Sequence, residues 1–214
     1  MSDVHAQRRN LPLLATKEAC AGRTYIVTGA NTGLGFEAAK HLVALGSAKV
    51  ILAVRNTKAG NEAKVKIESA TGVTGVADVW LLDLADYDSV KAFASKAIAG
   101  LGRIDGLIEN ASVASVSTEP INGQNANISI NVIGTFLLAA LLLPKLKETA
   151  FQMSAVPHLV FVSSRSGFEI EQLWNEFKDD PFVKLRTEDA GIQAAKVHLS
   201  LACLLACMKS LFQD

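Results

Sequence analysis

A glycine-rich turn is the part of the sequence with the clearest chemical use. Its glycines lie within one segment, which follows an apolar run and reads Thr28-Gly29-Ala30-Asn31-Thr32-Gly33-Leu34-Gly35. Glycines let the backbone turn sharply and approach a ligand closely. The free N–H groups and the dipole at the start of the following helix favour negative charge. The segment therefore predicts a binding site for the pyrophosphate group of a dinucleotide.

An arginine follows the second apolar run, in the segment Ala53-Val54-Arg55-Asn56. Sites that prefer NAD usually place a carboxylate at this point, where it bonds the ribose hydroxyls. A carboxylate would repel a 2′-phosphate, whereas a guanidinium pairs with phosphate through two hydrogen bonds. Arg55 therefore favours NADP(H) over NAD(H), with Lys58 as a second candidate. The alternative is that Arg55 is a solvated residue after a strand.

Strand-like and helix-like patterns alternate along the chain and must position these residues. Strands are expected at 25–27, 50–54, 76–82, 104–108 and 159–162, and helices at 36–45, 59–69, 87–99, 121–143 and 188–211. Buried apolar strands between helices indicate a parallel sheet covered on both faces. With right-handed crossovers, this predicts a doubly wound (Rossmann) α/β fold. Asp86 is expected to cap the third helix, and Pro144 to end the fourth.

The bulk composition narrows the function classes. The 214 residues suit a single domain, predicted at 23–214 after an N-terminal extension at 1–22. Lys plus Arg equals Asp plus Glu at 21 each, so charge gives no argument for nucleic-acid binding. The longest apolar run, 132–143, is too short for a membrane span, and no secretion signal is evident. A cytoplasmic protein without a metal site is expected, with its three cysteines as small apolar residues.

The spacing T-G-x-x-x-G-x-G resembles the short-chain dehydrogenase/reductase family, and the resemblance runs from about residue 23 to 211. Arg55 is similar to the arginine of the retinol-dehydrogenase-like members. The resemblance implies that Asp83 and Leu84 contact adenine. Asn110-Ala111-Ser112 looks like the family's Asn-Ala-Gly, with Ser112 in place of the glycine. A small-molecule alcohol or carbonyl substrate is implied.

The same resemblance implies a catalytic set of Asn, Ser, Tyr and Lys. Asn131, Ser164 and Lys196 match three of these positions, and Lys196 would also hold the cofactor ribose. Ile192 occupies the position of the tyrosine, which exchanges a proton with the substrate as hydride moves. Because isoleucine has no such proton, an NADP(H)-dependent oxidoreductase with impaired or atypical activity is expected.

Two other functions fit the same residues. One is a non-redox biosynthetic enzyme, such as a cyclase, isomerase or dehydratase, with its pocket shaped by the irregular segment 168–187. The other is a catalytically inactive protein that binds NADP(H).

The chain is expected to be shortened at its C-terminus relative to the family, which leaves a strand order of 3-2-1-4-5. The fifth strand then lies at an edge, and unpaired edges favour association. Leucines make the helices at 121–143 and 188–211 apolar over more than one core-facing stripe, which predicts a homodimer. The alternative is that some of these leucines line a wide core. The leucines assigned to this contact are Leu137, Leu138, Leu141, Leu142, Leu201, Leu204 and Leu205.

Overall fold

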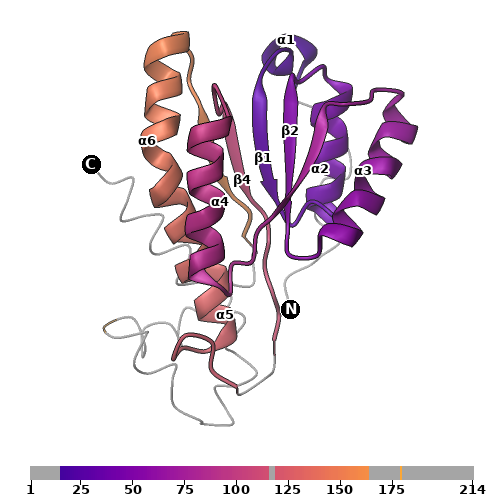
Figure 1. Ribbon diagram of the computed structural model, residues 1–214. Coiled ribbons are helices and arrows are strands. Elements are labelled where there is room, and N and C mark those ends of the chain that lie inside the picture. The colour runs from indigo at the N-terminus through magenta and orange to yellow at the C-terminus, as the bar shows by residue number, and fades with distance from the viewer. Residues whose placement is uncertain (1–14, 116–118, 164–178, 180–214) are drawn as a thin grey trace, which may run out of the picture.

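A five-stranded parallel sheet forms the centre of the protein, as a computed structural model of residues 15–115, 119–163 and 179 describes it (Figure 1). The strand order is β3-β2-β1-β4-β5. The strands are β1 (Thr24–Thr28), β2 (Lys49–Val54), β3 (Ala77–Leu81), β4 (Gly106–Glu109) and β5 (His158–Phe161). The predicted fold class and the predicted strand order are both confirmed.

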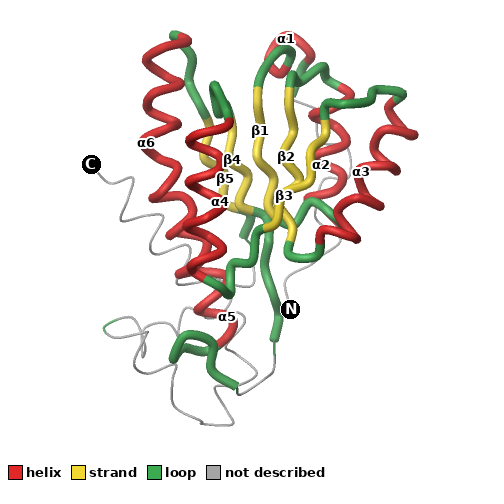
Figure 2. The backbone as a smooth tube through the Cα atoms, viewed as in Figure 1, coloured by secondary structure: helices red, strands yellow, loops and turns green. Residues whose placement is uncertain are grey.

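Helices cover both faces of this sheet (Figure 2). On one face lie α2 (Gly33–Ala44) and α3 (Thr57–Thr71), and on the other α4 (Tyr87–Gly100) and α6 (Thr135–Met153). Each face of the sheet has its own hydrophobic core, and successive strand residues point alternately into one and the other. Val27 packs in the core beneath α2, whereas Ile26 packs in the core beneath α4 and α6. This alternation follows from the two-residue period of a strand.

Short polar side chains fix where the helices begin. Asp86 accepts hydrogen bonds from the backbone N–H groups of Asp88 and Ser89 at the start of α4, which confirms the predicted cap. Asn56 caps α3 by accepting from Ala59 N at 3.1 Å. This cap holds the backbone next to Arg55, at the carboxyl end of β2.

The segment predicted as one helix over 121–143 differs from the prediction at both ends. Ile121 and Gln124 form a β-bridge, and the helix starts as α5 (Ala126–Ile128), passes through a π-helical segment η2 (Ser129–Gly134) and continues as α6. Pro144 lies inside α6 instead of ending it. An interior proline costs about 3 kcal/mol. Leu142 and Leu146 are buried on either side of it, at about 2 kcal/mol for each side chain, and this burial offsets that cost.

The continuous stretch Ala126–Met153 is long and apolar enough to cross a membrane by length and composition, with a mean hydropathy of 2.0. However, 67% of its most apolar window is buried inside the protein. Leu138 and Leu142, assigned above to a dimer contact, are fully buried in the core of one chain. The long apolar surface of this helix is therefore explained mainly by intramolecular packing, and the homodimer stays a prediction.

A short helix, α1 (Lys17–Cys20), precedes β1. Cys20 is buried in the same core cluster as Tyr25 and Val43, as expected for a small apolar side chain. The domain boundary near residue 22 stays a prediction. The other two cysteines, the helix predicted at 188–211 and the segment 168–187 lie outside the described residues.

Candidate functional site

The predicted phosphate-binding turn connects β1 to α2 at the carboxyl end of the sheet. Gly29 and Gly33 have φ values of +66° and +58°, a conformation that glycine adopts without strain. Thr32 is the N-cap of α2 and makes no side-chain hydrogen bond to the helix. Leu34 is 75% exposed beside these backbone groups. An open helix N-terminus with an exposed apolar side chain suits a ligand that is part anion and part ring.

Gly35 must be a glycine because of how closely the turn folds back on itself. A β-carbon at this position would lie 2.6 Å from the Gly29 carbonyl oxygen and would also overlap the side-chain nitrogen of Asn110. Gly29 is similarly close to its neighbour, since a β-carbon there would lie 3.0 Å from Ala111 Cα. The two glycines thus pack the turn against the loop that follows β4.

Thr28 ties that loop to the turn. Its Oγ1 accepts hydrogen bonds from Asn110 N and Ala111 N, both at 2.9 Å. The Asn110 side chain donates in return to the Thr28 carbonyl, also at 2.9 Å. These bonds bring the predicted Asn110 and Ala111 next to the turn, although they are some eighty residues away in sequence.

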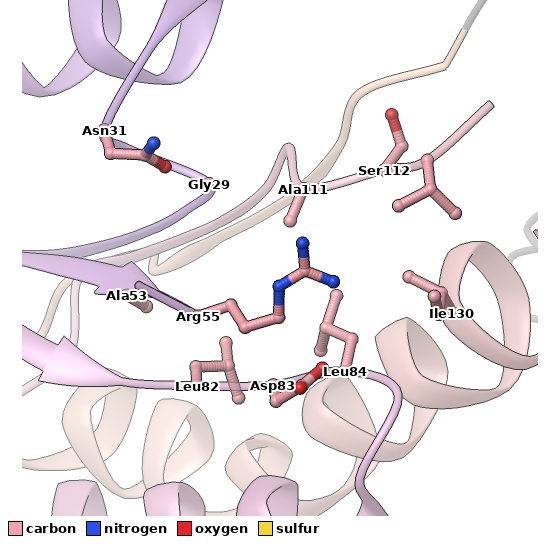
Figure 3. Close-up of a pocket in the computed structure, with 11 residues that line it drawn as sticks. Gly29, Asn31, Ala53, Arg55, Leu82, Asp83, Leu84, Ala111, Ser112 and Ile130 are labelled. Atoms are coloured by element: carbon pink, nitrogen blue, oxygen red, sulfur yellow. The ribbon is translucent and has the colours of Figure 1, made fainter. Parts of the chain in front are cut away.

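A pocket of about 160 Å³ lies at the carboxyl ends of the central strands (Figure 3). Open α/β sheets bind ligands in such a crevice, where the strand order reverses. The guanidinium of Arg55 reaches across this pocket above Asp83 and Leu84, towards Ala111 (Figure 3). The lining residues are Gly29, Asn31, Ala53, Arg55, Leu82, Asp83, Leu84, Ala111, Ser112, Val113 and Ile130.

Most of the pocket wall comes from residues that the sequence analysis singled out. Asp83 is oriented by hydrogen bonds at both its ends: its Oδ1 accepts from Ala85 N at 2.9 Å, and its backbone N–H donates to Ser89 at 3.0 Å. Leu82, Val113 and Ile130 were missed, because nothing in their local pattern separates a pocket wall from a core.

Asn131 is buried within the π-helical segment η2 and makes hydrogen bonds to the backbone of the loop that follows β4. Its Oδ1 accepts from Val113 N at 2.8 Å, and its Nδ2 donates to Val113 O at 2.9 Å. π-Helical turns are frequent at functional sites. The predicted catalytic asparagine therefore has a clear positioning contact: it fixes a wall of the pocket.

Replacing Asn131 by alanine is expected to lower the free energy of unfolding by about 2–3 kcal/mol, because two buried backbone groups of Val113 lose their partners. Urea unfolding followed by circular dichroism measures this change. Asn61→Ala is the matched control, since the Asn61 side chain bonds only an exposed carbonyl in α3. Equal destabilisation by the two substitutions would contradict the positioning role.

Glu109, beside Thr28 at the start of the turn, is a buried ionisable residue that the sequence analysis did not single out. It is the last residue of β4, is 3% exposed, and its Oε2 lies 3.4 Å from Thr28 Oγ1. Burial raises the pKa of this carboxyl to about 8. The sequence feature that could have indicated this burial is that Glu109 directly follows the apolar run Gly106-Leu107-Ile108, at a position where a buried strand ordinarily has an apolar side chain.

The remaining predicted catalytic positions, Ser164, Ile192 and Lys196, lie outside the described residues. The structure reaches Ser163, two residues past the end of β5, whose Oγ is buried without a hydrogen-bond partner. Within 15–115 and 119–163, no group of three or more His, Cys, Asp or Glu side chains is arranged to hold a metal ion.

Comparison with known proteins agrees with this architecture. A family model described as short chain dehydrogenase matches residues 23–176. The short chain dehydrogenase/reductase dmxR8 of a Cryptosporiopsis species is 45% identical over 145 residues, which cover 67% of this chain and 45% of that protein. The short chain dehydrogenase FGM9 of Gibberella zeae is 37% identical over 185 residues, 86% of this chain and 53% of that protein.

A solved structure of a short chain dehydrogenase from Shigella flexneri, complexed with NADP, matches with a TM-score of 0.66 and 26% identity. The match covers 92% of this chain and 73% of that one. The chain spans about half the length of these two fungal relatives. With the family model, the fungal relatives and the glycine-rich turn in agreement, the chain belongs to the short-chain dehydrogenase/reductase family of oxidoreductases.

Proposed function

We propose that this protein binds NADP(H) and acts in hydride transfer between the nicotinamide and the carbonyl or alcohol group of a small molecule. The observation that carries the proposal is the Arg55 guanidinium, which lies in the same pocket as Asp83 and Leu84, at a strand end without a carboxylate. The NADP in the Shigella flexneri relative supports it.

Each part of the site has a task in this proposal. Backbone N–H groups of the turn at 28–35 bind the pyrophosphate, Arg55 pairs with the 2′-phosphate, and Asp83 and Leu84 hold the adenine. The bound nicotinamide supplies or accepts the hydride. From the family resemblance, Ser164 polarises the substrate oxygen and Lys196 holds the ribose, with Asn131 fixing the pocket wall.

Ile192, in the tyrosine position, has no proton to exchange with the substrate. Loss of a general acid commonly lowers the rate by about 100- to 10,000-fold, so slow turnover is proposed. The dehydrogenase names of the relatives favour redox chemistry over a cyclase, an isomerase, a dehydratase or an inactive binding protein. The homodimer and the cytoplasmic location stay predictions.

Loss of NADPH absorbance with a panel of ketones and aldehydes tests the redox proposal. Slow, protein-dependent oxidation of NADPH is expected with at least one of them. NADPH binding without oxidation of the cofactor by any carbonyl would contradict hydride transfer and favour an inactive binding protein.

Arg55→Ala is expected to weaken NADPH binding by about 10- to 100-fold, since a charge-assisted hydrogen bond contributes about 1.5–3 kcal/mol. NADH binding should change little, because NADH has no 2′-phosphate. Fluorescence titration with each nucleotide gives both dissociation constants. Lys58→Ala measures the second candidate, and Lys66→Ala on exposed α3 is the control. Equal losses for NADPH and NADH would contradict the phosphate contact.

A further inference from the structure

The buried carboxyl of Glu109 lies behind the nucleotide turn. Glu109 is in register with Phe161 of β5, and the Phe161 ring stacks on Phe136 of α6 with centroids 4.9 Å apart. In-register residues of neighbouring strands face the same side of the sheet. Glu109 therefore points into the α6 side, where its Oε1 is buried without a hydrogen-bond partner.

One hydrogen bond separates this carboxyl from the turn. The Thr28 hydroxyl oxygen already accepts two backbone N–H groups, so its hydrogen must be donated onward. Its acceptors are Glu109 Oε2 and Ile108 O, each at 3.4 Å. Since Thr28 directly precedes Gly29, the carboxyl contacts the residue from which the phosphate-binding backbone starts.

Uncharged groups surround Glu109 among the residues that the structure describes. The carboxyl lies 3.4 Å from the Thr28 hydroxyl, and the strand position next to Glu109 on β5 is Phe161. The Glu109 carbonyl accepts a hydrogen bond from Val162 N. The ionisable side chains of α2 (Glu37, Lys40 and His41) lie on the opposite face of the sheet, and Lys147 of α6 is exposed. Lys145 and Glu148 of α6 pair with each other one turn from Thr149, which accepts from Ile104 N just before β4, at the other end of that strand from Glu109. His158 is in register with Gly106 at that same end, and Arg55 and Asp83 line the pocket. Arg165 and Lys196 lie outside the described residues.

This setting keeps the carboxyl protonated at neutral pH. Burial raises the pKa of Glu109 to about 8, and the hydrogen bond from Thr28 opposes the shift only in part. No charged neighbour contributes to the shift. The carboxyl is therefore neutral below this pH and becomes a buried anion above it.

We propose that Glu109 is a positioning residue of the nucleotide site, and that it must be uncharged for the turn after Thr28 to bind an anionic dinucleotide with full affinity. This inference rests on the proposed binding of NADP(H). When Glu109 is ionised, it is a buried negative charge one hydrogen bond away from Thr28, where solvent and salt screen it weakly. It repels the phosphates, and by linkage a bound dinucleotide favours the protonated form.

Titration of the full chain with NADPH between pH 6.5 and pH 9.5, followed by fluorescence, measures this coupling. Wild-type affinity is expected to fall about fivefold from pH 7 to pH 9, for a coupling of about tenfold between proton and nucleotide. Glu109→Gln keeps a neutral side chain of the same shape, so its affinity should be independent of pH over this range. Glu62→Gln, an exposed carboxylate on α3, should behave as wild type.

Calorimetry on the wild-type protein is a second test that needs no variant. At pH 8, measured in two buffers of different ionisation enthalpy, NADPH binding should be accompanied by uptake of a fraction of a proton by Glu109. The 2′-phosphate is already ionised at this pH, so it does not contribute to the uptake. Absence of proton uptake, or an equal pH dependence in wild type and Glu109→Gln, overturns the inference and leaves the proposed function standing. Failure to bind NADPH at pH 6.5, where Glu109 is neutral, overturns the proposed function instead.

Discussion

Gly35→Ala is expected to reduce NADPH affinity at least 100-fold, the largest effect on binding of any single substitution considered. The new β-carbon would lie 2.6 Å from the Gly29 carbonyl oxygen and would overlap the Asn110 side chain, which holds the turn to the β4 loop. The Gly29 carbonyl is backbone, and the Asn110 side chain is held by its hydrogen bond to the Thr28 carbonyl, so relief requires the turn itself to move. Such overpacking costs about 1–3 kcal/mol of stability in addition to the loss of the phosphate site.

Fluorescence titration with NADPH and urea unfolding separate the two effects. Gly100→Ala is the matched control: Gly100 is also a helical glycine, and a β-carbon there would meet nothing within 4 Å. It should leave nucleotide affinity unchanged. Near-normal NADPH binding by Gly35→Ala would show that the ligand does not sit on this turn.

Glu109→Gln is expected to give the largest change in stability. Glu109 titrates near its ordinary value of 4.5 in the unfolded chain and at about 8 in the folded protein. Between these values the folded state holds a proton that the unfolded state has lost, so stability falls as pH rises from about 4.5 to 8. At pH 7 the loss is on the order of 3 kcal/mol.

The glutamine amide does not titrate in this pH range, so the free energy of unfolding of the variant does not decrease as the pH rises through it. Its free energy of unfolding should exceed the wild-type value by an amount that grows with pH between 5 and 8. Urea unfolding without nucleotide, at half-unit pH intervals, measures the difference. Glu62→Gln should show no such trend. A constant offset between wild type and Glu109→Gln at all pH values would mean that Glu109 is ionised in the folded protein.

Much of the fold was predictable because its signals are local. Apolar strand runs, the turn at 28–35 and the Asp86 cap each lie within a few neighbouring residues. The rule that parallel crossovers are right-handed then gave the doubly wound fold class, and the order of the strands came from the family resemblance. In the site, Arg55 was singled out from its place after the second strand, whereas Asp83, Leu84 and Ala111 were assigned through the family resemblance. The structure brings all four to one pocket, because the carboxyl ends of parallel strands meet at one edge of a sheet.

The errors concern features that tertiary packing decides. Pro144 does not end α6, because Leu142 and Leu146 on either side of it are buried against α4 and β4. No local sequence pattern predicts the π-helical segment that carries Asn131. The hydrogen bonds between Asn131 and Val113 join residues 18 positions apart, so they could not be predicted from local sequence either. Glu109 was missed because a strand-end glutamate is ordinarily solvated, and only the three-dimensional structure places it in the interior.

A direct titration of the purified chain with NADPH and NADH at pH 6.5 tests the central claim, which is that the pocket beside the turn binds the phosphorylated dinucleotide. Saturable binding of NADPH is expected, at least tenfold tighter than that of NADH, since Arg55 would contribute about 1.4 kcal/mol or more through the 2′-phosphate. Absence of saturable NADPH binding, or tighter binding of NADH, would contradict the claim.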